Sequence, residues 1–224
     1  MADWMMKSAA LFKPLYDLLH QHLLTQDVLH ADETTLKVIN DERVKSYMWV
    51  YCSGADIPNI QPRYNNLDSI VLYDYQDGSR AGNCVSRFLA TEQTVFKGYL
   101  QVDGYAAYRQ ACNKLVGCWA HTRRKFKEAT VSQGKIKTGK VSKADMAIAK
   151  LYKIEQSLSL EERLYFRRTH SCAQLAEIKR WLDKSVDQVS TKSALGKAIQ
   201  YSLNQWSTLT RYVEDQAEYR QQPR

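Results

Sequence analysis

Cysteines are few in this sequence and lie far apart, which excludes two common classes of small protein. The five are Cys52, Cys84, Cys112, Cys118 and Cys172. No two of them form a CxxC pair, so neither a zinc site nor a disulfide framework is indicated. Unpaired thiols of this kind are typical of the reducing cytoplasm, and this is the compartment we expect.

Long apolar runs and a leader sequence are also missing. No apolar run reaches the roughly 20 residues that a membrane span needs, so no membrane partner is expected. The first residues lack the leading positive charge and the small-residue cleavage site of a signal peptide. Their apolar side chains recur at helical spacing instead, which predicts an amphipathic helix over residues 1–25 with Pro14 as the point where it could break.

The sequence does have an excess of positive charge, and one segment holds all of it. The formal net charge of the chain is +8. From Arg109 to Lys143, ten lysines or arginines stand against a single acid, Glu128, which gives this segment a net charge of +9. A local field of this kind attracts polyanions such as nucleic acid. A solvated basic face or a basic loop would have the same composition, so charge alone leaves both interpretations open.

Apolar and β-branched runs predict five strands, at residues 28–39, 47–52, 69–75, 98–103 and 115–120. Short connections make the first three an antiparallel meander. Helical segments at 80–90 and 105–111 separate the later strands, which implies parallel pairing through crossovers. This order predicts a mixed α/β sheet of the ribonuclease-H-like class, in which the fourth strand lies beside the first.

The periodicity of the sequence also divides it into parts. Residues 1–130 are predicted to form the ribonuclease-H-like core, including the N-terminal helix. The segment 131–143 is rich in glycine and lysine and is predicted to be a basic linker. Helical periodicity continues over 144–213, a predicted all-α insertion domain. Residues 214–224 lose this periodicity and are predicted to be a disordered tail.

Two of the predicted strands carry an aspartate that is a candidate catalytic residue. Asp32 lies inside the first strand, and Asp103 ends the fourth strand just before Gly104. If the fourth strand lies beside the first, the two carboxylates meet. Carboxylate oxygens are the ligands that Mg²⁺ prefers, and a pair of such ions about 3.5–4 Å apart can catalyse phosphoryl transfer. An aspartate before glycine is also a common turn choice, so a structural role for each stays open.

The residues next to these features complete the candidate site. Glu33 follows Asp32 directly and therefore faces the opposite side of the strand. A basic helix is predicted to follow the fifth strand, and its candidates for nucleic-acid contact are His121, Arg123, Arg124, Lys125 and Lys127. Cations are unfavourable in the first turn of a helix, and contact with phosphate would explain their presence there. A capping or surface role for His121 is equally compatible with the pattern.

Six segments of the chain, in order, resemble the transposases of the insertion-sequence-66 family. They are residues 30–34 (HADET), 98–108 (GYLQVDGYAAY), 118–126 (CWAHTRRKF), 151–155 (LYKIE), 193–201 (SALGKAIQY) and 204–206 (NQW). The resemblance implies a ribonuclease-H-like core that acts on DNA at transposon ends, with an Asp, Asp, Glu triad holding two Mg²⁺ ions. It assigns the first two acids to Asp32 and Asp103, and makes the helices after about residue 140 an insertion before the third.

The chain departs from that family pattern at both ends. The family has an Asn-Asn pair and then a Glu-Arg pair after the insertion, and these supply the third acid. Here the sequence reaches Glu218 and then ends in Gln-Gln-Pro-Arg. The family's N-terminal DNA-binding and zinc-binding parts are also missing. The sequence therefore predicts a central piece of a transposase, truncated at both ends, in which the third acid is lost, Mg²⁺ binding is impaired and DNA strands are neither cleaved nor joined.

Two other interpretations stay open. The chain could be an active nuclease or transposase that uses Glu155 as its third acid, with Glu128 as a weaker candidate. It could also be a non-catalytic DNA-binding or regulatory protein that competes or associates with an intact transposase, or with itself. The basic segment would supply the DNA contact in that case.

Overall fold

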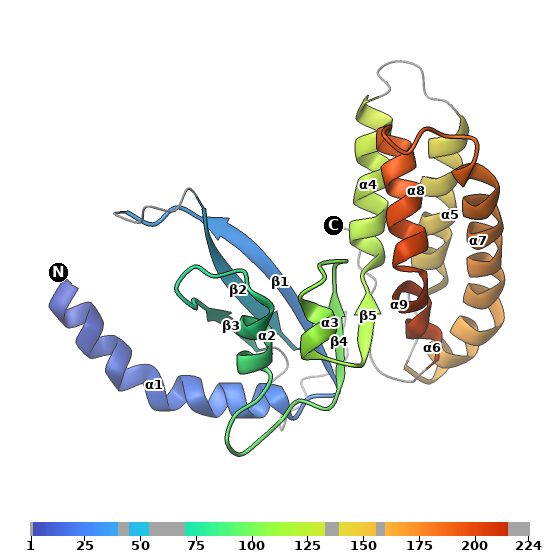
Figure 1. Cartoon of the computed structure of the whole chain (residues 1–224). Coiled ribbons are helices and arrows are strands. Elements are labelled where there is room, and N and C mark those ends of the chain that lie inside the picture. The colour runs from blue at the N-terminus through green and yellow to red at the C-terminus, as the bar shows by residue number, and fades with distance from the viewer. Residues whose placement is uncertain (1, 40–44, 54–69, 133–138, 156–159, 215–224) are drawn as a thin grey trace. The chain divides into compact units, whose positions relative to one another are not determined.

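The computed structural model describes residues 2–39, 45–53, 70–132, 139–155 and 160–214 (Figure 1). Contacts within the chain divide it into two compact units, Met1–Leu115 and Val116–Arg224. The first unit contains the strands up to Leu115, where the last strand crosses the boundary, and the rest of the second unit is helical. The predicted limits of a core, linker and insertion domain stay a prediction, and the predicted tail over 215–224 lies outside the described residues.

A mixed five-stranded sheet is the framework of the first unit. Its strands are β1 (Val28–Leu36), β2 (Ser46–Cys52), β3 (Val71–Asp74), β4 (Tyr99–Val102) and β5 (Leu115–Gly117), in the spatial order β3-β2-β1-β4-β5. The β1–β2 and β2–β3 pairs are antiparallel, and β4 runs parallel to β1. The predicted meander and the predicted position of the fourth strand are therefore observed, and the mixed α/β class is confirmed.

One face of this sheet carries the core of the unit. Because side chains alternate along a strand, Leu29 and Ala31 of β1 lie on the same face. The core joins them to residues of α2 (Gly82–Phe88), α3 (Tyr108–Ala111) and the C-terminal end of α1 (Ala2–Leu24). The ring of Tyr51 stacks on that of Phe88 with centroids 3.6 Å apart. Asp32 has the opposite parity in β1 and lies on the other face.

The N-terminal helix is continuous. α1 runs through Pro14 without a break, so a break at this proline does not occur. Proline removes one backbone hydrogen bond from a helix, but the ends of α1 are held by other contacts. Leu23 and Leu24 are buried in the core, and two i,i+4 ion pairs, Asp3–Lys7 and Lys13–Asp17, lie along the exposed surface.

The second unit is built from helices. They are α4 (Trp119–Ser132), α5 (Gly139–Glu155), α6 (Leu160–Phe166), a π-helical turn η1 (Arg167–Ser171), α7 (Cys172–Val186), α8 (Ala194–Asn204), α9 (Trp206–Thr210) and a 3₁₀ turn η2 (Arg211–Val213). α4, α5, α7 and α8 lie alongside one another as a bundle (Figure 1). Among the described residues, none of the helices combines the length and apolar character needed to span a bilayer.

Two boundaries in this unit differ from the prediction. The strand predicted over 115–120 ends at Gly117, and α4 already begins at Trp119. Trp119 is buried and donates its indole N–H to the carbonyl of Leu209 at 2.9 Å, which fixes it in the helical core. The helical periodicity predicted over 144–213 is interrupted at Gln205, whose φ and ψ of −100° and 6° separate α8 from α9.

Candidate active site

The pairing of β1 with β4 decides where the two candidate aspartates lie. Val28 pairs with Tyr99, Leu29 with Leu100, and His30 with Gln101. Continued by two residues, the same register sets Asp32 opposite Asp103. Directly opposed residues on neighbouring parallel strands project to the same side of a sheet. The structure pairs the two strands as far as His30 and Gln101. The meeting of the two aspartates on the face opposite the core is what this register predicts beyond that point.

Each of these carboxylates also makes a local hydrogen bond. Asp103 Oδ1 accepts from the backbone N–H of Tyr105 at 2.8 Å, which is an Asx turn that leads the chain out of β4. Asp32 Oδ1 accepts from the backbone N–H of Glu33 at 3.0 Å. Both aspartates are half-buried. The structural role that the sequence left open for Asp103 is thus present, and it fixes the side chain at the end of its strand.

Glu33 occupies the opposite face, as its position in the strand predicts. Its side chain is only 5% exposed. Arg80 donates Nε–H to Glu33 Oε1 at 2.9 Å, and the Tyr108 hydroxyl donates to Oε2 at 2.9 Å. Burial and the charge of Glu33 raise the pKa of Tyr108 far above its ordinary value, so its hydroxyl remains a donor. Glu33 is therefore held by protein groups behind the sheet.

Two polar residues beside the aspartates did not emerge from the sequence. His30 lies two residues before Asp32 on the same strand face, and its partner across the β1–β4 pairing is the buried Gln101. Burial lowers the pKa of His30 to about 4, so its imidazole is neutral at pH 7. The i,i+2 spacing of His30 and Asp32 in a strand is the signal that could have found it.

The residues around Asp32 and Asp103 meet the requirements of a Mg²⁺ site only in part. Two carboxylates on adjacent strands supply oxygen ligands of the kind that Mg²⁺ prefers. Within the described ranges, no group of three or more His, Cys, Asp or Glu side chains could hold a metal ion. Glu155 is the last residue of α5, and its side chain lies outside the described part of the chain. Glu128 is exposed on α4. The loss of the third acid, and the alternatives Glu155 and Glu128, thus stay predictions.

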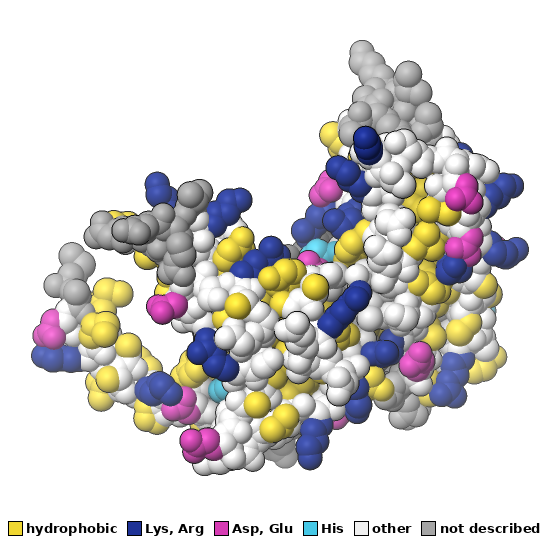
Figure 2. Space-filling model, in the orientation of Figure 1, with side chains coloured by type: hydrophobic (Ala, Val, Ile, Leu, Met, Phe, Trp, Pro, Cys, Tyr) yellow, Lys and Arg dark blue, Asp and Glu magenta, His cyan; other side chains and the backbone are white. Residues whose placement is uncertain are grey.

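The predicted nucleic-acid contacts on α4 have different environments. Arg123 donates Nε–H to Asp145 Oδ1 at 2.7 Å and so ties α4 to α5. Lys125 Nζ lies 4.6 Å from the centroid of the Tyr201 ring. Arg124 and Lys127 are exposed. Lysine and arginine side chains are spread over the visible surface of the helical unit (Figure 2). The nucleic-acid role of these residues stays a prediction, and it is best suited to Arg124 and Lys127.

His121 is engaged with its neighbour Cys118 at the start of α4. Burial by itself would raise the pKa of the Cys118 thiol. The hydrogen bond and charge of the His121 side chain, together with the backbone N–H groups of His121 and Ala120, lower this pKa on balance. These contacts hold His121 against Cys118 in the first turn of α4, and its capping, surface or nucleic-acid role stays a prediction.

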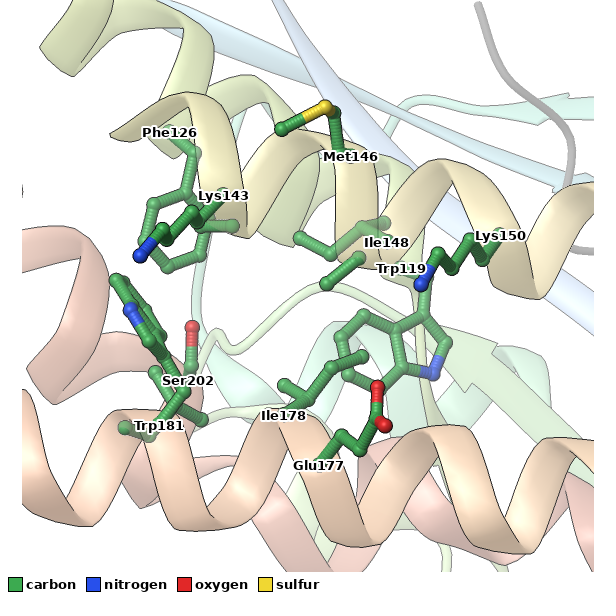
Figure 3. A pocket seen from close by; sticks show the side chains of 13 residues that line it. Trp119, Phe126, Lys143, Met146, Ile148, Lys150, Glu177, Ile178, Trp181 and Ser202 are labelled. Atoms are coloured by element: carbon green, nitrogen blue, oxygen red, sulfur yellow. The ribbon is translucent and has the colours of Figure 1, made fainter. Parts of the chain in front are cut away.

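The helical unit contains a pocket, and all the residues that line it come after both aspartates in the sequence. It has a volume of about 310 Å³ and is mainly apolar. Met146 and Ile148 of α5 and Ile178 and Trp181 of α7 line it, and lysines of α5 and Glu177 stand with them (Figure 3). The sequence analysis did not predict a pocket here. No member of the predicted acidic set lines it.

Comparison with known proteins identifies the family. Residues 1–218 match the model of the transposase IS66 family, and the chain belongs to that family. The uncharacterized protein y4qI of Sinorhizobium fredii is 30% identical over 236 residues, which cover 96% of this chain and 41% of y4qI. The uncharacterized protein y4jD of the same organism is 29% identical, over 95% of this chain and 42% of y4jD. No solved structure matches the chain.

The fraction of each relative's length that this chain matches bears on which function can be assigned to it. The chain spans about two fifths of the length of the curated relatives that it matches. The family supports a transposase-related function in general. The activity, metal and DNA contacts of this particular chain are therefore matters for a proposal.

Proposed function

We propose that this chain carries part of the phosphoryl-transfer core of a DNA transposase, on a ribonuclease-H-like sheet. Asp32 and Asp103 are its first two acids. The observation that supports this is the parallel register of β1 and β4, which would set the two carboxylates opposite each other if it continued by two residues. The family of the chain makes DNA the substrate class. We place this activity in the cytoplasm, where DNA of a bacterial cell is accessible.

In this proposal Asp32 and Asp103 hold Mg²⁺ through their carboxylate oxygens. When bound, the metal would stabilise the charge that develops on the attacking and leaving oxygens of a phosphodiester. Oδ1 of Asp103 would keep its bond to the backbone N–H of Tyr105 in the Asx turn, and Oδ2 would bind the metal. This site has two acids in place of three, so we propose that the chain alone binds the metal weakly and does not cleave DNA.

Binding of Mn²⁺, a paramagnetic substitute for Mg²⁺, tests the two aspartates. We expect the purified chain to bind Mn²⁺ measurably by electron paramagnetic resonance, and Asp32→Asn or Asp103→Asn to weaken this at least about tenfold. Glu92→Gln removes an exposed acid of the same unit and is the matched control. Equal affinity in the two aspartate variants and the wild type would refute the proposed site. Mg²⁺-dependent cleavage of transposon-end DNA that is lost in Asp103→Ala would refute inactivity.

A second function, DNA binding without chemistry, is favoured by the exposure of Arg124 and Lys127 on α4. Removing either by substitution with Ala should weaken DNA binding and reduce the slope of log K against log salt by about 1. Lys179→Ala, a partly exposed lysine of α7 paired with Asp183, is the control. Affinity that does not change with salt would exclude these residues as phosphate contacts.

A further inference from the structure

A set of side chains behind the sheet connects the two candidate aspartates. It begins at Glu33, the strand neighbour of Asp32, whose carboxylate is buried on the core face. Arg80 binds this carboxylate through Nε, at 2.9 Å, and through Nη2. Tyr108 donates its hydroxyl to the other oxygen. Glu33 is thus fixed from two directions, and with it the backbone of β1 at Asp32.

Arg80 also contacts Tyr105, the residue whose backbone bonds to Asp103. Its guanidinium carbon lies 4.0 Å from the centroid of the Tyr105 ring, close enough for a cation–π contact. The Tyr105 hydroxyl donates to the Arg80 carbonyl at 2.8 Å. The backbone N–H of Tyr105 in turn donates to Asp103 Oδ1. Tyr105 is therefore bonded to Arg80 and to Asp103 at once.

The contacts around Glu33 form a rigid arrangement, because breaking them would leave a buried carboxylate without partners. A buried carboxylate is strongly destabilising unless it is paired and hydrogen-bonded. The guanidinium of Arg80 is planar and can serve Glu33 through two donors while its face covers an aromatic ring. Any movement of the 103–105 turn would break the Tyr105 contacts of Arg80 and so disturb the pairing of Glu33. The positions of Asp32 and Asp103 are therefore coupled through the ion pair of Arg80 with Glu33.

We propose that Glu33, Arg80 and Tyr105 are positioning residues, which hold Asp32 and Asp103 in place for a shared divalent cation. This inference rests on the proposed function, because it takes the two aspartates as the metal ligands. The three residues do not touch the cation. They act through the backbone of β1 on one side and through the Asx turn on the other. Groups that orient metal ligands in this way typically contribute 10- to 100-fold to metal affinity.

Substitution of Arg80 distinguishes a positioning role from a purely electrostatic one, because the two roles change cation affinity in opposite directions. Arg80 carries a positive charge, so its removal should tighten cation binding if charge alone matters. Positioning requires the opposite. We expect Arg80→Gln and Arg80→Lys to weaken Mn²⁺ binding about tenfold or more, because Lys cannot supply the planar fork. Arg87→Gln removes an exposed arginine of α2 and should leave the affinity unchanged.

A more conservative substitution tests the same contacts with less risk that the variant fails to fold. Tyr105→Phe keeps the ring over Arg80 and removes only the hydroxyl contact, so its thermal stability should stay close to that of the wild type. We expect Mn²⁺ affinity to fall a few-fold and exchange of the residue 105 amide to become several-fold faster. Unchanged affinity and unchanged amide exchange in both Arg80→Lys and Tyr105→Phe would overturn the inference.

The two readouts also keep this inference apart from the proposed function. If the wild type does not bind Mn²⁺, the metal site fails, and the positioning role for a cation fails with it. Hydrogen exchange would then still report whether Arg80 holds the 103–105 turn. If the wild type binds Mn²⁺ and depends on Asp103 but not on Arg80 or Tyr105, the proposed function stands and the positioning inference alone is wrong.

Discussion

Cys118 shows how much the chemistry of one residue depends on its place at a helix end. Its thiol lies at the start of α4, where the His121 side chain and two backbone N–H groups lower its pKa below the ordinary value. We predict that alkylation of Cys118 by iodoacetamide rises with pH to a midpoint below 9, since the thiolate is the reactive form. Peptide mass spectrometry measures this rate for each cysteine separately.

His121→Gln provides the comparison for this prediction. Without the imidazole, two of the contacts that lower the pKa of Cys118 are lost while burial still acts to raise it. The pKa should therefore rise, and alkylation at pH 7.5 should slow several-fold. Exposed Cys172 serves as the internal reference in the same sample. A midpoint at or above 9 in the wild type, or the same rate in His121→Gln, would contradict the assigned contacts.

Single residues also show where sequence reasoning is strong and where it stops. The period of two in a strand was enough to separate Asp32 from Glu33, because alternation depends only on the local backbone. The fate of Arg123 could not be predicted in the same way. Its partner Asp145 is 22 positions further along, on another helix, and the rotation of that helix is decided by packing. A basic residue therefore cannot be assigned to DNA from composition alone.

At the scale of elements, α8 contains a glycine that its turn requires. The N-cap Ser193 Oγ accepts from the backbone N–H of Gly196 at 3.0 Å. A Cβ added at Gly196 would lie 2.1 Å from the carbonyl oxygen of Ser190. We predict that Gly196→Ala lowers the free energy of unfolding by about 1–3 kcal/mol, because backbone must move to relieve the overlap. Urea denaturation followed by circular dichroism measures this change.

Gly139→Ala is the matched control, since this glycine begins α5 and a Cβ there would meet no atom of the described residues within 4 Å. Alanine favours helix over glycine by up to about 1 kcal/mol, so stability should stay the same or increase. If both substitutions change stability equally, the close approach at Gly196 is not the cause. Stability of Gly196→Ala equal to that of the wild type would contradict the packing of the α8 N-terminus.

The elements differ in how well their limits could be predicted. Alternation and β-branched residues placed β2 and β4 to within a residue, because these signals are local. The prediction was wrong at residues 118–120, where a strand was expected and α4 begins. Cysteine is not a usual N-cap, so the sequence held no recognised signal for a helix start there. The break between α8 and α9 at Gln205 was also not predicted, because glutamine is not a typical helix breaker.

At the scale of the molecule, the order of strands and helices was enough to predict the topology of the sheet. Short connections favour antiparallel neighbours and crossovers favour parallel ones, and the β3-β2-β1-β4-β5 order follows. The candidate site could be predicted only as a pair of aspartates on neighbouring strands. Glu33, Arg80 and Tyr105 come from three separate segments, and their contacts depend on side-chain packing that no spacing in the sequence encodes.

The whole chain also presents an exposed apolar surface on α1. Trp4, Leu11, Leu15 and Leu18 recur at helical spacing and are more than half exposed. This helix carries hydrophobic side chains on its visible surface (Figure 2). Apolar patches of this extent favour association, and a second copy of the chain is the partner always present in a pure sample. We predict concentration-dependent self-association, measured by size-exclusion chromatography with light scattering, that Leu11→Glu reduces.

Ala10→Glu introduces the same charge at an exposed position one residue away, on the polar side of α1 where the Asp3–Lys7 and Lys13–Asp17 pairs lie. It should leave the molar mass distribution unchanged. Neither variant should alter the melting temperature appreciably, because Leu11 is 80% exposed and contributes little to the core. A wild-type chain that stays monomeric up to high concentration, or equal loss of association in both variants, would show that the apolar stripe of α1 does not drive assembly.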